Sequence, residues 1–229
     1  MEEYVAFKNW DLAFKPTELE SELYEGDFRD ITIKGKAVLD IGFGNGGFMG
    51  WAKEKGATVS GIEVISDAVH GGKDFGFDTY LYPGFDTDAF EGHFDLIVAL
   101  DLFEHLTIQQ INDYLGLIEK CLKPNGQVVL RFPNGQSPFG RIYQYADVTH
   151  ISVLSAKIME QLLGPTNLTI TSVREPYFAI QWNKGFLFGL AKSMQKAGRS
   201  LMFFLLKKLV GLGDYTMDIN VVLILRKKA

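Results

Sequence analysis

A run of glycines that follows an aspartate is the most chemically informative part of this 229-residue sequence. The stretch VLDIGFGNGGFM (residues 38–49) contains Asp40 and then glycines at 42, 44, 46 and 47. Glycine adopts positive φ without steric penalty and lets a ligand lie against the backbone, while the first amides of a helix are unpaired donors. The stretch predicts a buried strand, a tight turn and the start of a helix, which together would bind a nucleotide-type cofactor.

Two cofactor fingerprints overlap in this stretch. Gly42, Gly44 and Gly47 satisfy G-x-G-x-x-G, and Glu63 follows about 20 residues on, as a dinucleotide site of a dehydrogenase requires. With Asp40 in front, the pattern also fits D-x-G-x-G-x-G. A carboxylate at the end of the first strand suits a ligand with an ammonium group and would repel a pyrophosphate. Asp40 therefore disfavours the dehydrogenase interpretation, as does the lack of room for a second domain.

Two of the histidines are candidates for a general base. His105 follows the apolar run 94–100, and His150 ends the long segment 133–150. Both would lie beyond the carboxyl ends of parallel strands, where such sheets bind ligands. Histidine titrates near neutral pH and can take a proton from a hydroxyl nucleophile. We predict that either His150 or His105 is the base and that Asp147 could orient His150.

The segment PNGQSPFGRIYQYADVTH (133–150) is long for a loop in a compact domain, and long ordered loops are commonly functional. Its aromatic and hydrogen-bonding groups suit a polyhydroxyl substrate, and the predicted substrate-binding residues are Asn134, Arg141, Tyr143 and Tyr145. No metal site is predicted, because the spacing of Asp101, Asp147 and His150 in the sequence does not match a known pattern of metal ligands.

Strands and helices alternate along most of the chain. We predict strands before the glycine turn and at 57–62, 79–82, 94–100, 127–132, 168–173 and 217–225. We predict helices from the glycine turn to Gly56, from Ser66 to Gly76, from the Thr107 and Gln110 capping box to the 124–126 turn, and from Ser155 to Gly164. This alternation predicts a parallel sheet with helices on both faces.

The charges of the chain are unevenly distributed. Residues 1–30 carry nine acidic and three basic residues, and apolar residues spaced three to four apart predict a helical cover over 1–34. Residues 184–213 carry six basic residues and no acidic one. The segment 185–212 is predicted to form a basic amphipathic helix. Such a helix either lies in an anionic membrane interface or packs as a lid or dimer helix.

Composition limits the remaining classes of function. The chain is 47% hydrophobic and 22% charged, which suits one domain with a substantial core. Its net charge of −5 argues against a general nucleic-acid binder. The single Cys121 rules out an internal disulfide and favours a reducing compartment. A cytoplasmic location is expected, since no apolar run approaches the ~18 residues of a membrane span and the N-terminus lacks the basic residues of a secretory signal.

From about Val38 to Arg174 the sequence resembles the class I S-adenosylmethionine-dependent methyltransferases. VLDIGFGNGG is similar to the family's glycine motif, FDLIVALDLFEHL to its fourth-strand motif and LKPNGQVVL to the segment that leads into its fifth strand. The resemblance implies a single Rossmann-like α/β domain over residues 1–229. Its seven-stranded sheet would be mostly parallel with an antiparallel last strand, and its cofactor would be S-adenosylmethionine.

The resemblance also implies roles for the cofactor-binding residues. Asp40 and the backbone of Gly42, Gly44 and Gly46 would bind the methionine end of the cofactor. Glu63, with the adjacent Val64, would bind the ribose, and Phe85 and Asp86 would contact the adenine. Leu100 and Asp101 would lie beside the sulfonium.

The segment FPNGQSPFGRIYQYADVTHIS is similar to a segment of methyltransferases associated with bacterial surface-polysaccharide biosynthesis. This resemblance implies a saccharide or lipid-linked glycan acceptor, such as a lipopolysaccharide, and contact of 185–212 with the inner face of the membrane would bring the enzyme to it. Two alternatives stay open. One is a small-molecule methyltransferase of natural-product or quinone metabolism, and the other is a non-catalytic S-adenosylmethionine-binding regulatory protein. A homodimer also stays open.

Overall fold

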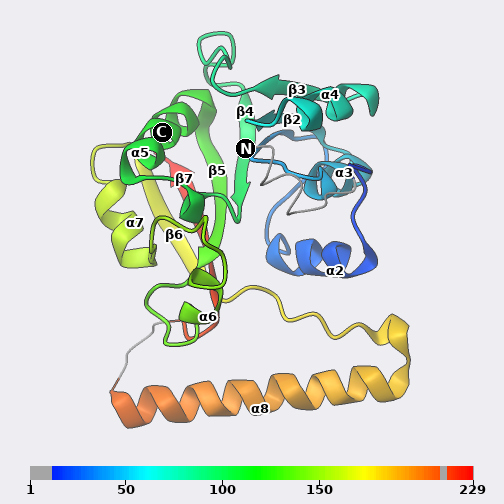
Figure 1. Cartoon of the computed structure of the whole chain (residues 1–229), viewed down its shortest axis with the longest axis vertical. Coiled ribbons are helices and arrows are strands. Elements are labelled where there is room, and N and C mark those ends of the chain that lie inside the picture. Colours follow the sequence, from blue (N-terminus) through cyan, green and yellow to red (C-terminus); the bar gives the residue numbers. More distant parts are fainter. Residues whose placement is uncertain (1–11, 212–215, 229) are drawn as a thin grey trace.

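The protein is built on one seven-stranded sheet (Figure 1). The computed structural model describes residues 12–211 and 216–228. The strands are β1 (Ala37–Ile41), β2 (Thr58–Glu63), β3 (Asp78–Leu81), β4 (Phe94–Leu100), β5 (Leu122–Pro133), β6 (Leu168–Arg174) and β7 (Asn220–Lys227), in the order β3-β2-β1-β4-β5-β7-β6. Strands β1 to β5 pair in parallel, and β7 lies antiparallel between β5 and β6. The predicted fold, with its antiparallel last strand, is confirmed.

Helices cover both faces of the sheet, as predicted. They are α2 (Glu18–Asp27), α3 (Gly47–Glu54), α4 (Ser66–Asp74), α5 (Ile108–Cys121), α6 (Arg141–Gln144), α7 (Ala156–Leu162) and α8 (Phe186–Val210), with short 3₁₀ turns at Phe103–His105 and Trp182–Lys184. The apolar side chains of α3 and α4 join one core cluster, and those of α5 and α7 join the other.

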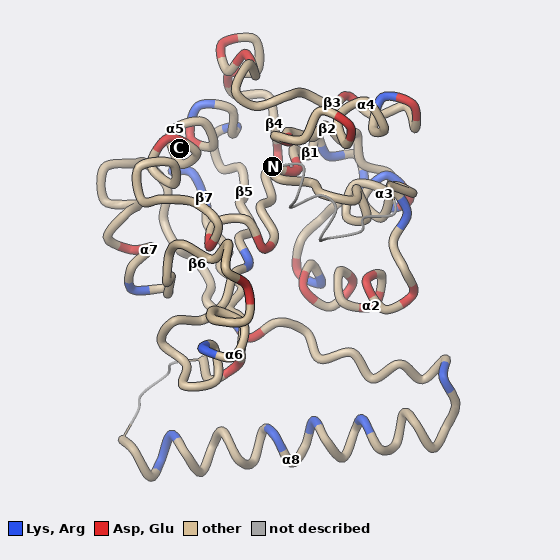
Figure 2. The backbone as a smooth tube through the Cα atoms, in the orientation of Figure 1, with Lys and Arg blue, Asp and Glu red and all other residues tan. Residues whose placement is uncertain are grey.

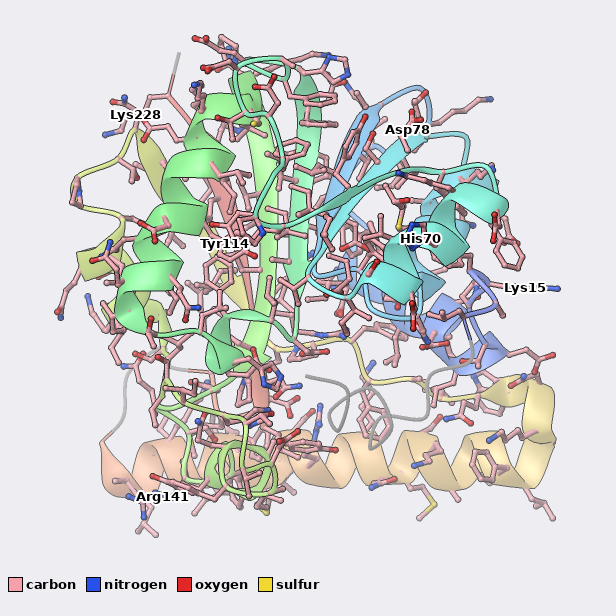
Figure 3. The ribbon with its side chains drawn as sticks, turned by 45° about the horizontal axis from the view of Figure 1, so that its top comes forward. Lys15, His70, Asp78, Tyr114, Arg141 and Lys228 are labelled. Atoms are coloured by element: carbon pink, nitrogen blue, oxygen red, sulfur yellow. The ribbon has the colours of Figure 1, made fainter. Side chains whose placement is uncertain are left out.

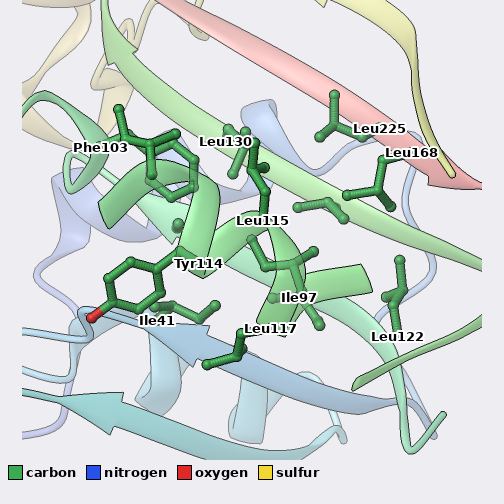
Figure 4. Close-up of a cluster of buried hydrophobic side chains, with 14 of the residues drawn as sticks. Ile41, Ile97, Phe103, Tyr114, Leu115, Leu117, Leu122, Leu130, Leu168 and Leu225 are labelled. Atoms are coloured by element: carbon green, nitrogen blue, oxygen red, sulfur yellow. The ribbon is translucent and has the colours of Figure 1, made fainter. Parts of the chain in front are cut away.

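Strand β4 shows how the sequence produces these two layers. Leu96 and Val98 pack on the side of α3 and α4, while Ile97 and Ala99 pack on the side of α5. Figure 4 shows Ile97 beside side chains of α5 such as Leu115. Successive strand residues point to opposite faces, so a strand covered on both faces must be apolar throughout. This is why FDLIVAL has no alternation of polar and apolar residues.

The residues predicted to begin helices and to form turns are confirmed with two corrections. Thr107 and Gln110 form the predicted capping box at the start of α5. Ser66 is the first helical residue of α4 rather than its cap, which is Ile65. The predicted turn at 124–126 is a bulge inside β5: Leu122 pairs with Phe94 and Gln127 with Leu96, so the intervening residues loop out. Asn125 makes this possible by adopting a φ of 62°.

Two elements lie outside this sandwich. Helix α2 is the described part of the predicted cover over 1–34, and residues 1–11 of that prediction lie outside the described residues. Helix α8 confirms the helix predicted over 185–212, of which residue 212 is not described. Its 25 residues span about 37 Å at 1.5 Å per residue, across one end of the molecule (Figure 1). No described helix is long and apolar enough to cross a membrane.

Candidate active site

A cleft of about 410 Å³ opens at the carboxyl ends of β1, β4 and β5, where a parallel sheet is expected to bind its ligands. Its lining comes from the glycine turn, the ends of β4, β5 and β7, α2 and the segment 133–150. The lining residues are Glu20, Tyr24, Asp40, Gly42, Phe43, Gly44, Asn45, Phe48, Leu100, Asp101, Glu104, His105, Arg131, Pro133, Tyr143, Asp147, His150 and Asn220.

The glycine turn is held by Glu63 at the end of β2. One carboxylate oxygen of Glu63 accepts a hydrogen bond from Gly44 N at 3.1 Å, and the other accepts one from Val64 N at 2.6 Å. Gly42 and Gly44 have φ values of 72° and 55°, in the region that favours glycine. The turn predicted from the sequence therefore forms, and Glu63 fixes it while keeping lone pairs that could accept from the hydroxyls of a ribose.

Asp40 is a buried carboxyl at the base of the cleft. Burial, together with the negative charge of Glu63, raises the pKa of Asp40 to about 8. A cation bound in the cleft beside Asp40 would favour the ionised form and lower this pKa. The ammonium group of S-adenosylmethionine is such a cation, so the residues present fit the expected cofactor at its methionine end.

Gly46 has a different surrounding from the other two motif glycines. A Cβ atom there would lie 2.1 Å from the ring of Phe14, and the φ of Gly46 is 75°. The third glycine of the motif therefore makes room for the segment that precedes α2. Gly46 lies outside the lining of the cleft, and its predicted cofactor role stays a prediction.

The residues expected at the ribose and adenine also lie outside the lining of this cleft. Phe85 packs into the core against the ring of Tyr80. The Asp86 carboxylate accepts a hydrogen bond from Ala89 N at 3.2 Å and so caps its own turn. Val64 is exposed beside the glycine turn. Contact of Phe85, Asp86 and Val64 with the cofactor stays a prediction.

The end of β4 is tied to the next strand by an ion pair that the sequence analysis missed. Arg131 of β5 donates from Nε to both oxygens of Asp101, at 3.1 Å each, and from Nη2 to Oδ2 at 2.5 Å. Its Nη1 donates to Asp27 at the end of α2, at 3.4 Å. Arg131 thus holds Asp101 and α2 together over the cleft. A charge inside the apolar run QVVLRF was the signal that could have revealed it.

The acceptor side of the cleft contains the histidine pair. The rings of His105 and His150 meet edge to face with centroids 4.6 Å apart. The Asp147 carboxylate accepts a hydrogen bond from the Thr149 hydroxyl at 2.6 Å, and this hydroxyl lies 2.9 Å from Nδ1 of His105. A chain of hydrogen bonds from Asp147 therefore reaches His105. That Asp147 orients His150 stays a prediction. Nδ1 of His150 is buried and has no hydrogen-bond partner among the described residues.

The predicted substrate-binding residues are dispersed. Tyr143 lines the cleft, whereas Tyr145 is exposed outside its lining. Arg141 lies beside α8, with Leu206 near it (Figure 3). Asn134 corrects the prediction: it is 1% exposed, and its amide donates to both oxygen atoms of Thr216 at 3.0 Å each. Asn134 braces the loop against the segment before β7.

Helix α2 adds two lining residues that the sequence analysis did not single out. Glu20 and Tyr24 both line the cleft, so α2 lies beside it. A cover formed by the whole of 1–34 stays a prediction. Burial raises the pKa of Tyr24, and its hydroxyl stays protonated at neutral pH. The sequence signal was the spacing of Tyr24 among the apolar residues of this segment.

Fold and cleft together define a Rossmann-like domain with a ligand cleft at the glycine turn. Residues 23–173 match the family described as a methyltransferase domain. The chain belongs to this family.

Individual relatives are distant. A ubiquinone biosynthesis O-methyltransferase of Klebsiella pneumoniae (strain 342) is 26% identical over 140 residues, which cover 55% of this chain and 56% of that enzyme. The match thus spans little more than half of the relative's length. A SAM-dependent methyltransferase from Archaeoglobus fulgidus superposes with a TM-score of 0.59 at 18% identity, covering 90% of this chain and 94% of that one. The PH0226 protein from Pyrococcus horikoshii OT3 gives 0.65 at 15% identity, covering 100% and 99%. These two structures show the fold alone.

Proposed function

We propose that this enzyme transfers the methyl group of S-adenosylmethionine to a hydroxyl of a saccharide, such as a sugar of a surface polysaccharide or lipopolysaccharide. The observation that carries the proposal is the His105 and His150 pair at the acceptor side of the cleft. Methyl transfer is an in-line displacement in which the hydroxyl oxygen bonds to the methyl carbon while sulfur leaves with the electron pair. A neutral hydroxyl must lose its proton in this step, and the histidine pair is suited to promote that loss.

The charges around the cleft support an uncharged acceptor. Four acidic side chains line it besides Asp40, and they are Glu20, Asp101, Glu104 and Asp147. Arg131 is the basic lining residue, and its guanidinium is already paired with Asp101. A phosphate or carboxylate on the acceptor would be repelled at this place, whereas the hydroxyls of a sugar would find hydrogen-bond acceptors.

Labelled S-adenosylmethionine tests the proposal. Transfer of label to extracted lipopolysaccharide or capsule precursors is expected. A His105→Ala and His150→Ala double variant should lose at least about a hundredfold in kcat, the usual size of acid–base contributions, while it still binds the cofactor. His70→Gln, an exposed change on α4 (Figure 3), is the matched control. Cofactor binding without transfer to any saccharide, phenol or other hydroxyl acceptor would instead indicate a non-catalytic regulatory protein.

A phenolic precursor of a quinone is the second candidate acceptor. The Klebsiella relative is a ubiquinone biosynthesis O-methyltransferase, and the match covers 55% of this chain and 56% of that enzyme. A phenol is also uncharged before it reacts, so the acidic lining does not exclude it. The same labelling assay with catechols beside the saccharides separates the two candidates.

We also propose that α8 binds an anionic membrane surface, at the inner face of the cytoplasmic membrane. Most apolar side chains of α8 support this because they are exposed: Leu187 is 79% exposed and Leu209 83%. Phe203 is the exception and packs against Phe139. Two of its basic side chains contact the body: Arg199 pairs with Asp218 at 2.9 Å and Lys196 lies over the ring of Tyr177, whereas Lys208 is exposed.

Charge favours lipid over a second copy of the chain. Helix α8 carries Lys and Arg but no Asp or Glu (Figure 2), so pairing two copies would bring like charges together. An apolar face flanked by cations suits the interface of an anionic bilayer.

Flotation with phosphatidylcholine vesicles, with and without phosphatidylglycerol, tests this proposal. The wild type should float with the anionic vesicles, and a Leu187→Ser, Leu201→Ser and Leu205→Ser triple variant should not. Equal flotation of both proteins would contradict the proposal. A dimer in sedimentation that this variant abolishes would show instead that a second copy covers the face.

A further inference from the structure

We infer that Glu104, His105 and His150 bind a first-row divalent transition-metal ion at the acceptor side of the cleft. Each residue offers one ligand atom, and these atoms all lie within 4.8 Å of one another. The inference rests on the proposed function only for the task of the ion in O-methylation. It replaces the expectation that the sequence contains no metal site.

The three ligands come from two segments that the backbone joins. Glu104 and His105 lie in the 3₁₀ turn after β4, and His150 lies near the end of the loop after β5. The carbonyl oxygen of Glu104 accepts hydrogen bonds from Ile151 N at 2.8 Å and Ser152 N at 3.0 Å. The loop is therefore attached to the turn at the residues that follow His150, which positions the third ligand before any ion binds.

The hydrogen bonds of His105 select the tautomer that a ligand needs. Nδ1 of His105 lies 3.3 Å from the carbonyl oxygen of Thr149, which can only accept, and 2.9 Å from its hydroxyl, whose proton goes to Asp147. Nδ1 must therefore carry the proton, and Nε2 carries the lone pair. A metal-bound imidazole is typically oriented in this way, by a hydrogen bond from its other nitrogen.

His150 and Glu104 provide the second line of support. Nδ1 of His150 is buried in the cleft wall and lacks a hydrogen-bond partner among the described residues, which is costly for a polar atom unless a ligand satisfies it. Glu104 is only 2% exposed, so its carboxylate is withdrawn from bulk water beside the two imidazoles.

The donor set narrows the identity of the ion. Two imidazoles and one carboxylate suit Zn²⁺, Fe²⁺, Mn²⁺ or Co²⁺, whereas Mg²⁺ and Ca²⁺ prefer oxygen ligands. Three protein ligands leave positions open for the substrate. An acceptor with two neighbouring hydroxyls, a vicinal diol or a catechol, could occupy two of them.

The ion would act as a Lewis acid on the acceptor. Coordination lowers the pKa of the bound hydroxyl, which releases its proton to water at neutral pH. The resulting metal-bound oxygen forms a bond to the methyl carbon, the carbon–sulfur bond breaks, and its electron pair stays on sulfur. The products are the methyl ether and the neutral thioether S-adenosylhomocysteine, so charge and atoms balance.

Direct metal titration of the chelator-treated, tag-free protein tests the inference. Calorimetry with Zn²⁺, Mn²⁺ and Co²⁺ should show one site for at least one of these ions, and Co²⁺ should give visible absorption bands that Zn²⁺ abolishes. Glu104→Gln, His105→Ala and His150→Ala should each bind at least about tenfold more weakly, whereas His70→Gln should bind as the wild type does. Calorimetry with S-adenosylmethionine confirms that each variant is folded.

Thr149 provides a test that a purely structural role would not pass. Thr149→Val removes the hydroxyl that orients His105 and should weaken metal binding by about 10- to 100-fold, the usual effect of losing an outer-shell partner. Thr149→Ser retains the hydroxyl and should restore wild-type affinity. Equal metal affinity of the Val and Ser variants would contradict the orienting role, and with it the ligand assignment of His105.

The two proposals can fail separately. Absence of binding for every ion, with methyl transfer that EDTA does not reduce, would overturn the metal site and leave the O-methyltransferase standing. Metal binding that depends on the three ligands, without methyl transfer to any hydroxyl acceptor, would confirm the site and overturn the proposed function. Loss of transfer in EDTA that is restored by the ion that binds would support both.

Discussion

Glu63 shapes the glycine turn and is the residue predicted to bind the ribose. Its carboxylate already accepts from Gly44 N and Val64 N, so the glycine turn is shaped before the cofactor arrives. A carboxylate accepts up to about four hydrogen bonds, so these oxygens could also accept from a ribose hydroxyl. A ligand that meets a prearranged acceptor loses less conformational entropy on binding.

We expect Glu63→Gln to weaken binding of S-adenosylmethionine by roughly 10- to 100-fold, because a hydrogen bond to a charged group contributes about 1.5 to 3 kcal/mol. The amide would also present a donor where Gly44 N needs an acceptor. Isothermal titration calorimetry measures the change. Glu54→Gln, an exposed residue at the end of α3, is the control. Unchanged affinity in Glu63→Gln would show that the ribose does not contact this residue.

Asp40 makes stability depend on pH. In the unfolded chain an aspartate titrates near ~4, whereas in the folded protein burial and then Glu63 raise its pKa to about 8. The folded state therefore holds a proton that the unfolded state has lost, and the Asp40 contribution to the free energy of unfolding falls as pH rises from about 4 to 8, then levels off. Urea denaturation at pH 6 and pH 8 should show a smaller decrease for Asp40→Asn than for the wild type. Equal decreases would refute the raised pKa.

Cofactor binding should release this proton. The ammonium group beside Asp40 favours the carboxylate, so near pH 7 binding should be accompanied by net loss of up to one proton. Calorimetry in buffers of different ionisation enthalpy would detect it, and Asp40→Asn should abolish the dependence on buffer. A wild-type binding enthalpy that is the same in all buffers would place the ammonium group elsewhere.

At the scale of single residues, the sequence identified residues whose chemistry is local and missed those whose partners are distant in the sequence. Asp40, Glu63, His105 and His150 could be found because each follows a strand or ends a loop at a characteristic place. Arg131 was missed because its partners lie 30 and 104 residues away. Asn134 was misassigned for the same reason, since the oxygen atoms that satisfy it are 82 residues further on.

Among the elements, α2 links the cleft to α8. Glu22 of α2 accepts hydrogen bonds from Ile180 N at 2.8 Å and Gln181 N at 3.1 Å, and Asp27 accepts one from Tyr177 N at 2.6 Å. The acids of the N-terminal region thus hold the strand-like segment that leads into α8. Glu20 and Tyr24 on the same helix line the cleft. A shift of α8 that moved α2 would therefore change the positions of these two side chains.

The ion pair between Arg199 and Asp218 also attaches α8 to the body of the protein. Arg199→Ala leaves the Asp218 carboxylate, which is 8% exposed, without this partner. We expect a loss of about 1 to 3 kcal/mol in the free energy of unfolding, measured by urea denaturation, together with faster amide exchange over 186–210. Lys208→Ala, an exposed change on the same helix, is the control. Unchanged exchange in Arg199→Ala would show that α8 is held by other contacts.

For the molecule as a whole, the alternation of elements was enough to predict a parallel sheet with helices on both faces. The antiparallel last strand came from the family resemblance, and the strand order was not predicted, because periodicity does not encode which strands are neighbours. The orientation of α8 could not be read from the sequence either. Its pattern is that of an ordinary amphipathic helix, and the structure turns the apolar side away from the core.

Cofactor binding should stabilise the entire domain. At a concentration of S-adenosylmethionine 100 times its Kd, linkage adds about 2.7 kcal/mol. For a chain of this size that raises Tm by roughly 5 to 10 °C. Differential scanning calorimetry should show this shift, and NAD at the same concentration should produce none. A shift with NAD alone would reverse the choice between the two glycine fingerprints.

The position of β7 in the sheet has a consequence for biosynthesis. Strand β6 pairs only with β7, yet α8 lies between them in the chain. On the ribosome, β6 and then α8 emerge while the strand that joins β6 to β5 has not been made. The outward apolar face of α8 is therefore made before the sheet can close. If α8 binds a membrane as proposed, that contact can form during translation, before the catalytic domain has finished folding.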